Sequence, residues 1–91
     1  MALTKEVVVD KIEVLEMGQV QVRTATRVKE DGAVLSSSFH RHVVEPSTKA
    51  SGSWADTDIS GEDARVQAVA NATWTSDVKT AYQEMIDAQT P

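Results

Sequence analysis

Cysteine is absent from this 91-residue chain. Its absence excludes disulfides, thiolate nucleophiles and the zinc sites that use cysteine ligands, and it leaves no sign of the redox compartment. Aromatic residues are few, and the four in the chain are Phe39, Trp54, Trp74 and Tyr82. Valine and alanine must therefore fill most of a limited core. Because small side chains bury little area each, we expect a neighbouring subunit to supply further burial.

Long hydrophobic runs are also missing. The first residues, MALTKEVVVDKIEV, carry acids where a signal peptide needs an apolar run. No stretch of the chain approaches the ~20 apolar residues of a membrane span. We therefore expect a soluble protein that is made in the cytoplasm and has no membrane partner.

The excess charge has one sign and one location. The net charge is −5, and residues 51–91 carry all of it, with two basic and seven acidic side chains. Residues 1–50 are balanced, with seven side chains of each sign. An acidic surface repels phosphate backbones, so we expect no nucleic-acid partner.

The first half of the chain has the alternating pattern of β-strands. Residues 19–29 show it best, because valine and threonine occupy the even positions and mainly polar side chains occupy the odd ones. Turns are expected at Met17-Gly18 and Asp31-Gly32, and Glu45-Pro46 ends the last strand. The three expected strands span residues 5–16, 19–29 and 33–44.

The second half of the chain changes character twice. Residues 46–60 are rich in Ser, Thr, Gly and Asp without periodicity, which predicts a long loop. Apolar side chains then recur at helical spacing over residues 61–73 and 76–88. We therefore predict a single α+β domain over residues 1–91: a three-stranded antiparallel β-meander followed by a long loop and two short C-terminal α-helices. A helical hairpin is expected to cover one face of the sheet.

The stretch FHRH holds the only two histidines of the chain. In a strand, His40 and His42 project from one face, and Phe39 and Arg41 from the other, so both imidazoles could reach one ion. A zinc site needs three or four protein ligands, and the sequence places no further ligand nearby. Three serines at 36–38 precede the stretch without a nucleophile elbow or a positioned acid. We therefore predict no bound metal, no catalytic residue and no enzyme.

The run DTDISGEDARVQ, residues 56–67, begins like the calcium loop of an EF-hand. Two aspartates, a serine and a glycine fall at its first, third, fifth and sixth positions. The twelfth position is Gln67, where the motif needs a bidentate glutamate. The competing interpretation is an acidic turn that caps the following helix and favours its dipole. We predict no calcium site and no other cofactor.

Trp54 is the one bulky side chain in the expected loop. It is either an anchor for a partner's pocket or a plug for the end of a core that is short of aromatics. Trp74, between the two helices, is expected in the core at the bend. The strand around FHRH has two mixed faces, which is typical of a sheet edge or a subunit contact. The candidate interface residues are therefore Trp54, Phe39, His40, Arg41 and His42.

Several stretches of the chain, taken together, resemble small uncharacterised proteins found among the structural genes of tailed bacteriophages. These stretches are VVVDKIEV, the charged hairpin that follows it, SSSFHRHVVEP and VQAVANATWTSDVKTAYQ. The resemblance implies a non-enzymatic structural or accessory protein of the virion, associated with the tail, its fibres or the baseplate. Capsid decoration, as a cement protein, is the nearest alternative. Its expected partners are other virion proteins and further copies of itself in a homo-oligomer or larger assembly.

Two interpretations from other functional classes stay open. One is a small metal-dependent or hydrolytic protein that uses His40, His42 and the serines. The other is a soluble regulator that binds a host protein through Trp54 and the acidic helices.

Overall fold

The computed structural model describes residues 2–89 of the chain, so residues 1, 90 and 91 of the predicted domain lie outside the described range. The elements, in chain order, are β1 (Leu3–Val14), β2 (Val20–Glu30), β3 (Ala33–Val44), β4 (Ser47–Ala50), β5 (Ser53–Asp56), α1 (Ala64–Thr73) and α2 (Ser76–Gln89). The first three strands form one antiparallel sheet in the order β1-β2-β3. The predicted α+β fold, with a three-stranded meander and two C-terminal helices, is confirmed.

The prediction of a loop throughout residues 46–60 was wrong. β4 and β5 pair in antiparallel register within it, from Ser47 opposite Asp56 to Ala50 opposite Ser53. The turn between them is Ser51-Gly52, and both residues have positive φ, at 52° and 79°. Two-residue turns of this kind match the twist of a hairpin. The four-residue strands carry no apolar alternation, so the pattern that predicted the other strands could not reveal them.

Pairing with β2 fixes which residues share a face of the three-stranded sheet. The helix-side face contains Val20 and Val22, which lie beside Val44 and Ile12 of the neighbouring strands. The opposite face, here the charged face, contains the odd positions of β2, with arginines on both sides of a buried Ala25. Two bulges interrupt the pairing, because Asp10 in β1 and Leu35 in β3 have no opposite residue in β2.

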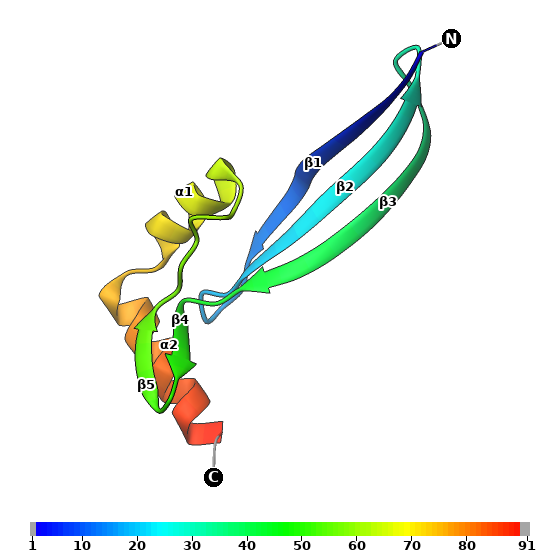
Figure 1. Cartoon of the computed structure of the whole chain (residues 1–91). Coiled ribbons are helices and arrows are strands. Elements are labelled where there is room, and N and C mark those ends of the chain that lie inside the picture. The colour runs from blue at the N-terminus through cyan, green and yellow to red at the C-terminus, as the bar shows by residue number, and fades with distance from the viewer. Residues whose placement is uncertain (1, 90–91) are drawn as a thin grey trace.

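The hydrophobic core lies between α1 and one end of the helix-side face. Val20, Val22 and Val66 are fully buried there, and Val44 and Ala70 complete its centre. A ten-residue helix is about 15 Å long, whereas a twelve-residue strand reaches about 40 Å. α1 therefore covers only the end of the sheet next to the β1–β2 turn (Figure 1).

Trp74 joins the sheet to the helices. Its indole N–H donates a hydrogen bond of 2.7 Å to the carbonyl of Gly18 in the β1–β2 turn. The side chain is 8% exposed, so the predicted core position of Trp74 at the bend is confirmed. Gly18 has a φ of +89°, and a Cβ there would lie 2.6 Å from Val78 and 3.1 Å from Pro46. The turn must therefore be glycine, both for its backbone angle and for the close contact.

α2 packs mainly against the β4–β5 hairpin rather than on the large sheet. Tyr82 is buried at this contact, and Gln83 donates a hydrogen bond of 3.1 Å to the buried hydroxyl of Ser47. The prediction that a helical hairpin covers one face of the sheet was therefore wrong, because only α1 packs on the sheet while α2 packs on the β4–β5 hairpin. Neither helix of residues 2–89 is long and apolar enough to span a membrane.

The molecule is elongated. Its extents are 57 × 26 × 23 Å, and its radius of gyration is 17.0 Å, whereas a compact chain of this length has about 12 Å. Figure 1 shows the cause: the sheet projects from a base made of the β4–β5 hairpin and the helices, with the start of β1 near its far tip. Much of the sheet therefore has no covering layer within residues 2–89.

The close contact at Gly18 predicts the effect of a single methyl group. Gly32 also has positive φ, at 86°, but a Cβ there would meet nothing within 4 Å. We expect Gly32→Ala to lower the free energy of unfolding by about 1 kcal/mol and Gly18→Ala by about 2–4 kcal/mol, the difference reflecting the clash. Urea denaturation followed by circular dichroism measures both. Val78→Ala in the Gly18→Ala background should recover part of the loss, and equal losses for the two glycines would contradict the proposed contact.

Tyr82 predicts a pH dependence of stability. Burial, followed by a hydrogen bond with Glu45 and the charge of that carboxylate, raises the pKa of Tyr82 from 10.0 to about 12. The phenol must therefore stay protonated in the fold, so its contribution is fully present below pH 10 and is lost as the pH rises toward 12. The loss should be about 2 kcal/mol. Tyr82→Phe has no proton to lose, so its unfolding free energy should fall less over the same interval, and parallel curves would refute the assignment.

Candidate functional site

The FHRH stretch lies in β3, an edge strand of the projecting sheet. Phe39 and Arg41 pair with Ala25 and Arg23 on the charged face, whereas His40 and His42 lie on the helix-side face. The alternation predicted from the sequence is therefore present. Phe39 and Arg41 therefore lie on the face without a helix, whereas His40 and His42 lie on the face that α1 partly covers.

The histidine pair contacts an acid that precedes α1. His42 Nε2 lies 2.7 Å from Glu62 Oε1, and the rings of His40 and His42 stack with centroids 6.3 Å apart. No group of three His, Cys, Asp or Glu residues within the described chain is placed to hold a metal ion. The arrangement links β3 to the segment before α1, and Glu62 is a partner that the sequence did not indicate.

The acidic run before α1 is used in local turns. Asp58 accepts a hydrogen bond of 2.9 Å from the backbone N–H of Ser60, which lowers the pKa of that carboxyl. Asp63 accepts one of 2.9 Å from the N–H of Arg65 and is the N-cap of α1. The helix therefore begins at Ala64, three residues later than predicted, because Asp63 caps it.

Trp54 lies at the contact between β5 and α2. Its indole N–H donates a hydrogen bond of 3.3 Å to Asp87, and its ring meets the ring of Tyr82 edge-on, with centroids 6.1 Å apart. Lys49 binds the same carboxylate at 2.9 Å, and together the two contacts lower the pKa of Asp87. The side chain is half-buried, so Trp54 plugs the base of its own chain. Its role in an interface stays a prediction.

The charged face is crossed by ion pairs between β1 and β2. Arg23 forms two hydrogen bonds with Asp10, of 2.9 and 2.7 Å, and Glu6 binds Arg27 at 2.9 Å and Lys29 at 3.2 Å. These bonds lower the pKa of both carboxyl groups. The bulge at Asp10 brings its carboxylate to Arg23, and no sequence spacing indicated that pairing.

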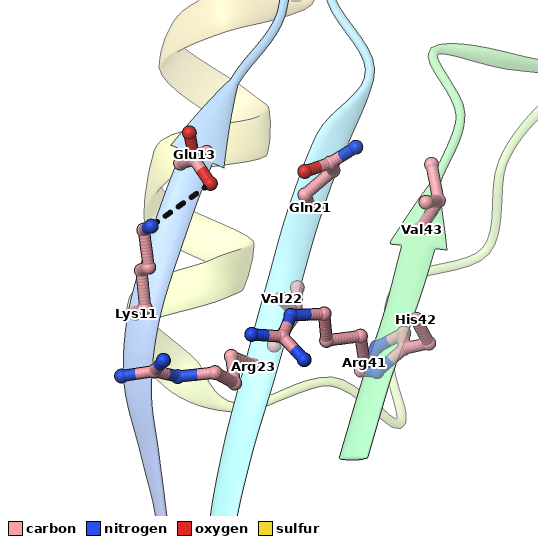
Figure 2. A pocket seen from close by; sticks show the side chains of 8 residues that line it. All are labelled: Lys11, Glu13, Gln21, Val22, Arg23, Arg41, His42 and Val43. Atoms are coloured by element: carbon pink, nitrogen blue, oxygen red, sulfur yellow. Dashed lines mark ion pairs between the residues drawn. The ribbon is translucent and has the colours of Figure 1, made fainter. Parts of the chain in front are cut away.

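A shallow cleft of about 130 Å³ lies at the end of the charged face, seen from close by in Figure 2. A row of cations crosses it, since Lys11, Arg23 and Arg41 lie opposite one another on the three strands. In Figure 2 the side chain of Arg41 reaches toward β2, and Lys11 pairs with Glu13 at 3.3 Å. Among residues 2–89 Arg41 has no ion-pair partner. The cleft offers a cationic hydrogen-bond donor at the sheet surface.

Apolar side chains remain half-exposed along both edge strands and at the start of the β1–β2 turn. Those that exceed a third of their free surface are Leu3, Val7, Val14, Leu15, Val34, Leu35, Phe39 and Val43. Four of them belong to β3, and we call Val34, Leu35, Phe39 and Val43 the β3 apolar row. The guanidinium of Arg23 lies over the Phe39 ring, 4.5 Å from its centroid. A patch of this kind on a small protein is typical of a surface that contacts another protein.

Comparison of the chain with protein-family models, with curated proteins and with solved structures finds no match. The surface is therefore interpreted from its own geometry.

The contact between His42 and Glu62 predicts that the two histidines differ in their effect on stability. His42→Ala removes the partner of a half-buried carboxylate, so the free energy of unfolding should fall by about 1 kcal/mol. Within residues 2–89 His40 has only the ring contact, and His40→Ala should change the free energy of unfolding by less than half as much. Thermal and urea unfolding measure both. The same midpoints with and without added Zn²⁺ are expected, and a large Zn²⁺-dependent rise that either variant abolishes would instead support a metal site.

Proposed function

We propose that this protein is a non-enzymatic structural component of a virion that works through protein–protein contacts made by its projecting sheet. The observation that carries the proposal is the β3 apolar row, which lies half-exposed on a sheet of which α1 covers only one end within residues 2–89. The free energy of burying such side chains is available only if another chain covers them. The resemblance of the sequence to bacteriophage structural proteins supports the assignment to a virion.

The surroundings of the histidines favour binding over catalysis. His42 is held by Glu62, and no hydrogen bond within residues 2–89 joins either histidine to a serine hydroxyl. Ser36, Ser37 and Ser38 all lie exposed along an open strand, where water competes for every polar contact. A nucleophile needs a base within hydrogen-bond reach and a site that excludes water. The hydrolytic alternative therefore has no supporting contact.

The shape of the molecule favours a place in the tail, its fibres or the baseplate. A base and a projecting sheet can engage two neighbours at once, as a connecting subunit requires, and the long sheet offers backbone as well as side-chain contacts. Capsid decoration is the second placement. A regulator that binds a host protein through Trp54 is less favoured, because that side chain already contacts Tyr82 and Asp87.

Purified virions provide the test. We expect the protein in mass spectra of gradient-purified particles at a stoichiometry of several copies per particle, and absent from the soluble lysate fraction after assembly. An abundant non-virion protein from the same infection serves as the control for carry-over. Absence of the chain from particles, together with recovery of a host protein in a pull-down, would overturn the assignment in favour of the regulator.

A further inference from the structure

We propose that two copies of this chain pair through the outer edge of β3, in antiparallel register with Phe39 opposite Phe39, so that two three-stranded sheets join into one of six strands. The inference rests on the proposed function, in which the projecting sheet contacts other proteins. It identifies one of those partners as a second copy of the same chain.

The two edges of the sheet differ in how they are protected. β1 carries five charged side chains along its twelve residues, and the bulge at Asp10 distorts its edge. β3 carries a single permanently charged side chain, Arg41, and the segment from Ala33 to Phe39 has none. Natural sheets block unwanted pairing with edge charges, proline and bulges. The edge of β3 has only the bulge at Leu35, near its start, so the strand beyond it is left open to pairing.

The sequence of β3 fits a second copy of itself. A twofold axis beside Phe39 brings the two half-exposed rings together on the charged face and places Ser37 opposite Arg41 of the second copy. The two arginines are then offset by four residues, about 13 Å, which is beyond the range of strong repulsion in physiological salt. The smaller side chains on the helix-side face also meet without a clash of charge, since Ser38 lies opposite His40.

The isolated chain exposes more surface than a typical folded monomer of its mass, and the excess is close to the area that one partner buries in an interface. The accessible surface is 6044 Å² for 9.9 kDa. Folded monomers of that mass expose about 5,200 Å². The excess is about 800 Å², which is close to what each partner buries in a stable interface.

A closed pair is favoured over an open chain of copies. Pairing of β3 with β1 of the next copy would repeat without limit, and it would set an edge with a single permanent charge against the highly charged and bulged one. Pairing of β3 with itself uses both open edges and leaves the two protected β1 edges outward. The pair therefore ends at two copies at this surface, while the base of each copy stays available for other contacts.

Engineered cysteines test the register, and the natural chain has no cysteine to interfere. Residues directly opposite in antiparallel strands have Cα atoms about 4.5–5.5 Å apart, within the range of a disulfide. We expect Phe39→Cys to give a covalent dimer in nearly full yield under mild oxidation. Ser37→Cys, two residues away on the same face, should stay uncrosslinked, because its two copies lie about 13 Å apart. Val7→Cys on β1 is the control for random collision, with a side chain as exposed as Phe39.

Charge substitution tests the same contact without a covalent bond. Phe39→Lys and Phe39→Glu should each weaken dimerisation by a factor on the order of 10 to 100, because like charges then face each other. An equimolar mixture of the two variants should restore the dimer, since only a twofold contact brings residue 39 against itself. Val7→Lys is the matched control and should dimerise like the natural chain. Circular dichroism of each variant confirms that it is folded.

The outcomes separate this inference from the proposed function. A natural chain that stays monomeric at 100 μM in light scattering, yet is found in purified particles, would overturn β3 pairing while the virion assignment stands. A dimer that crosslinks through position 37 and not 39, or that Phe39→Lys leaves intact, would also overturn it. Dimers that crosslink at position 39 and recover on mixing the charge variants support it.

Discussion

The contact between Trp74 and Gly18 is the one on which the rest of the structure depends. The indole donates to the turn carbonyl from 56 residues away, and its ring fills the space where the turn, Pro46 and α2 meet. A buried carbonyl without a donor costs free energy. Glycine is required at the turn because of its positive φ and because a Cβ there would clash with Val78 and Pro46. This contact fixes where the sheet leaves the base and therefore which part of it α1 can cover.

The part of the sheet that α1 covers is limited by the length of that helix. The three long strands contain about 35 residues, whereas α1, the helix that covers part of them, has only ten. The helix buries Val20 and Val22 but ends well short of the tip. The charged face has no covering layer within residues 2–89, and the Arg23–Asp10 and Arg27–Glu6 pairs stabilise it on either side of buried Ala25. Half-exposed cross-strand pairs of this kind add modest stability and keep the surface of β1 polar.

The two edge strands of the sheet differ in charge and in exposed apolar surface. β1 is charged and bulged, whereas β3 presents serines, Phe39 and a row of aliphatic side chains. A strand that had only to complete the sheet would gain from charges along its outer edge. The near absence of such charges from β3, together with a surface larger than the mass requires, supports the proposal that β3 contacts another chain. In the base, Trp54 contacts Tyr82 and Asp87 of α2.

The sequence by itself determined the α+β class, the presence of three long strands and two helices, and the core position of Trp74, whereas β1 lies two residues earlier in the chain than predicted. Those features depend on local periodicity and on small turn residues, and both signals lie within a single segment of the sequence. Tertiary structure decided the rest: the β4–β5 hairpin, whose strands have no apolar alternation, the capping of α1 by Asp63, and the packing of Trp54 on α2. It also decided that Glu62 holds His42 and that Phe39 lies on the face of the sheet opposite α1. Both depend on contacts between segments about 20 or more residues apart, which a pattern along the chain does not contain.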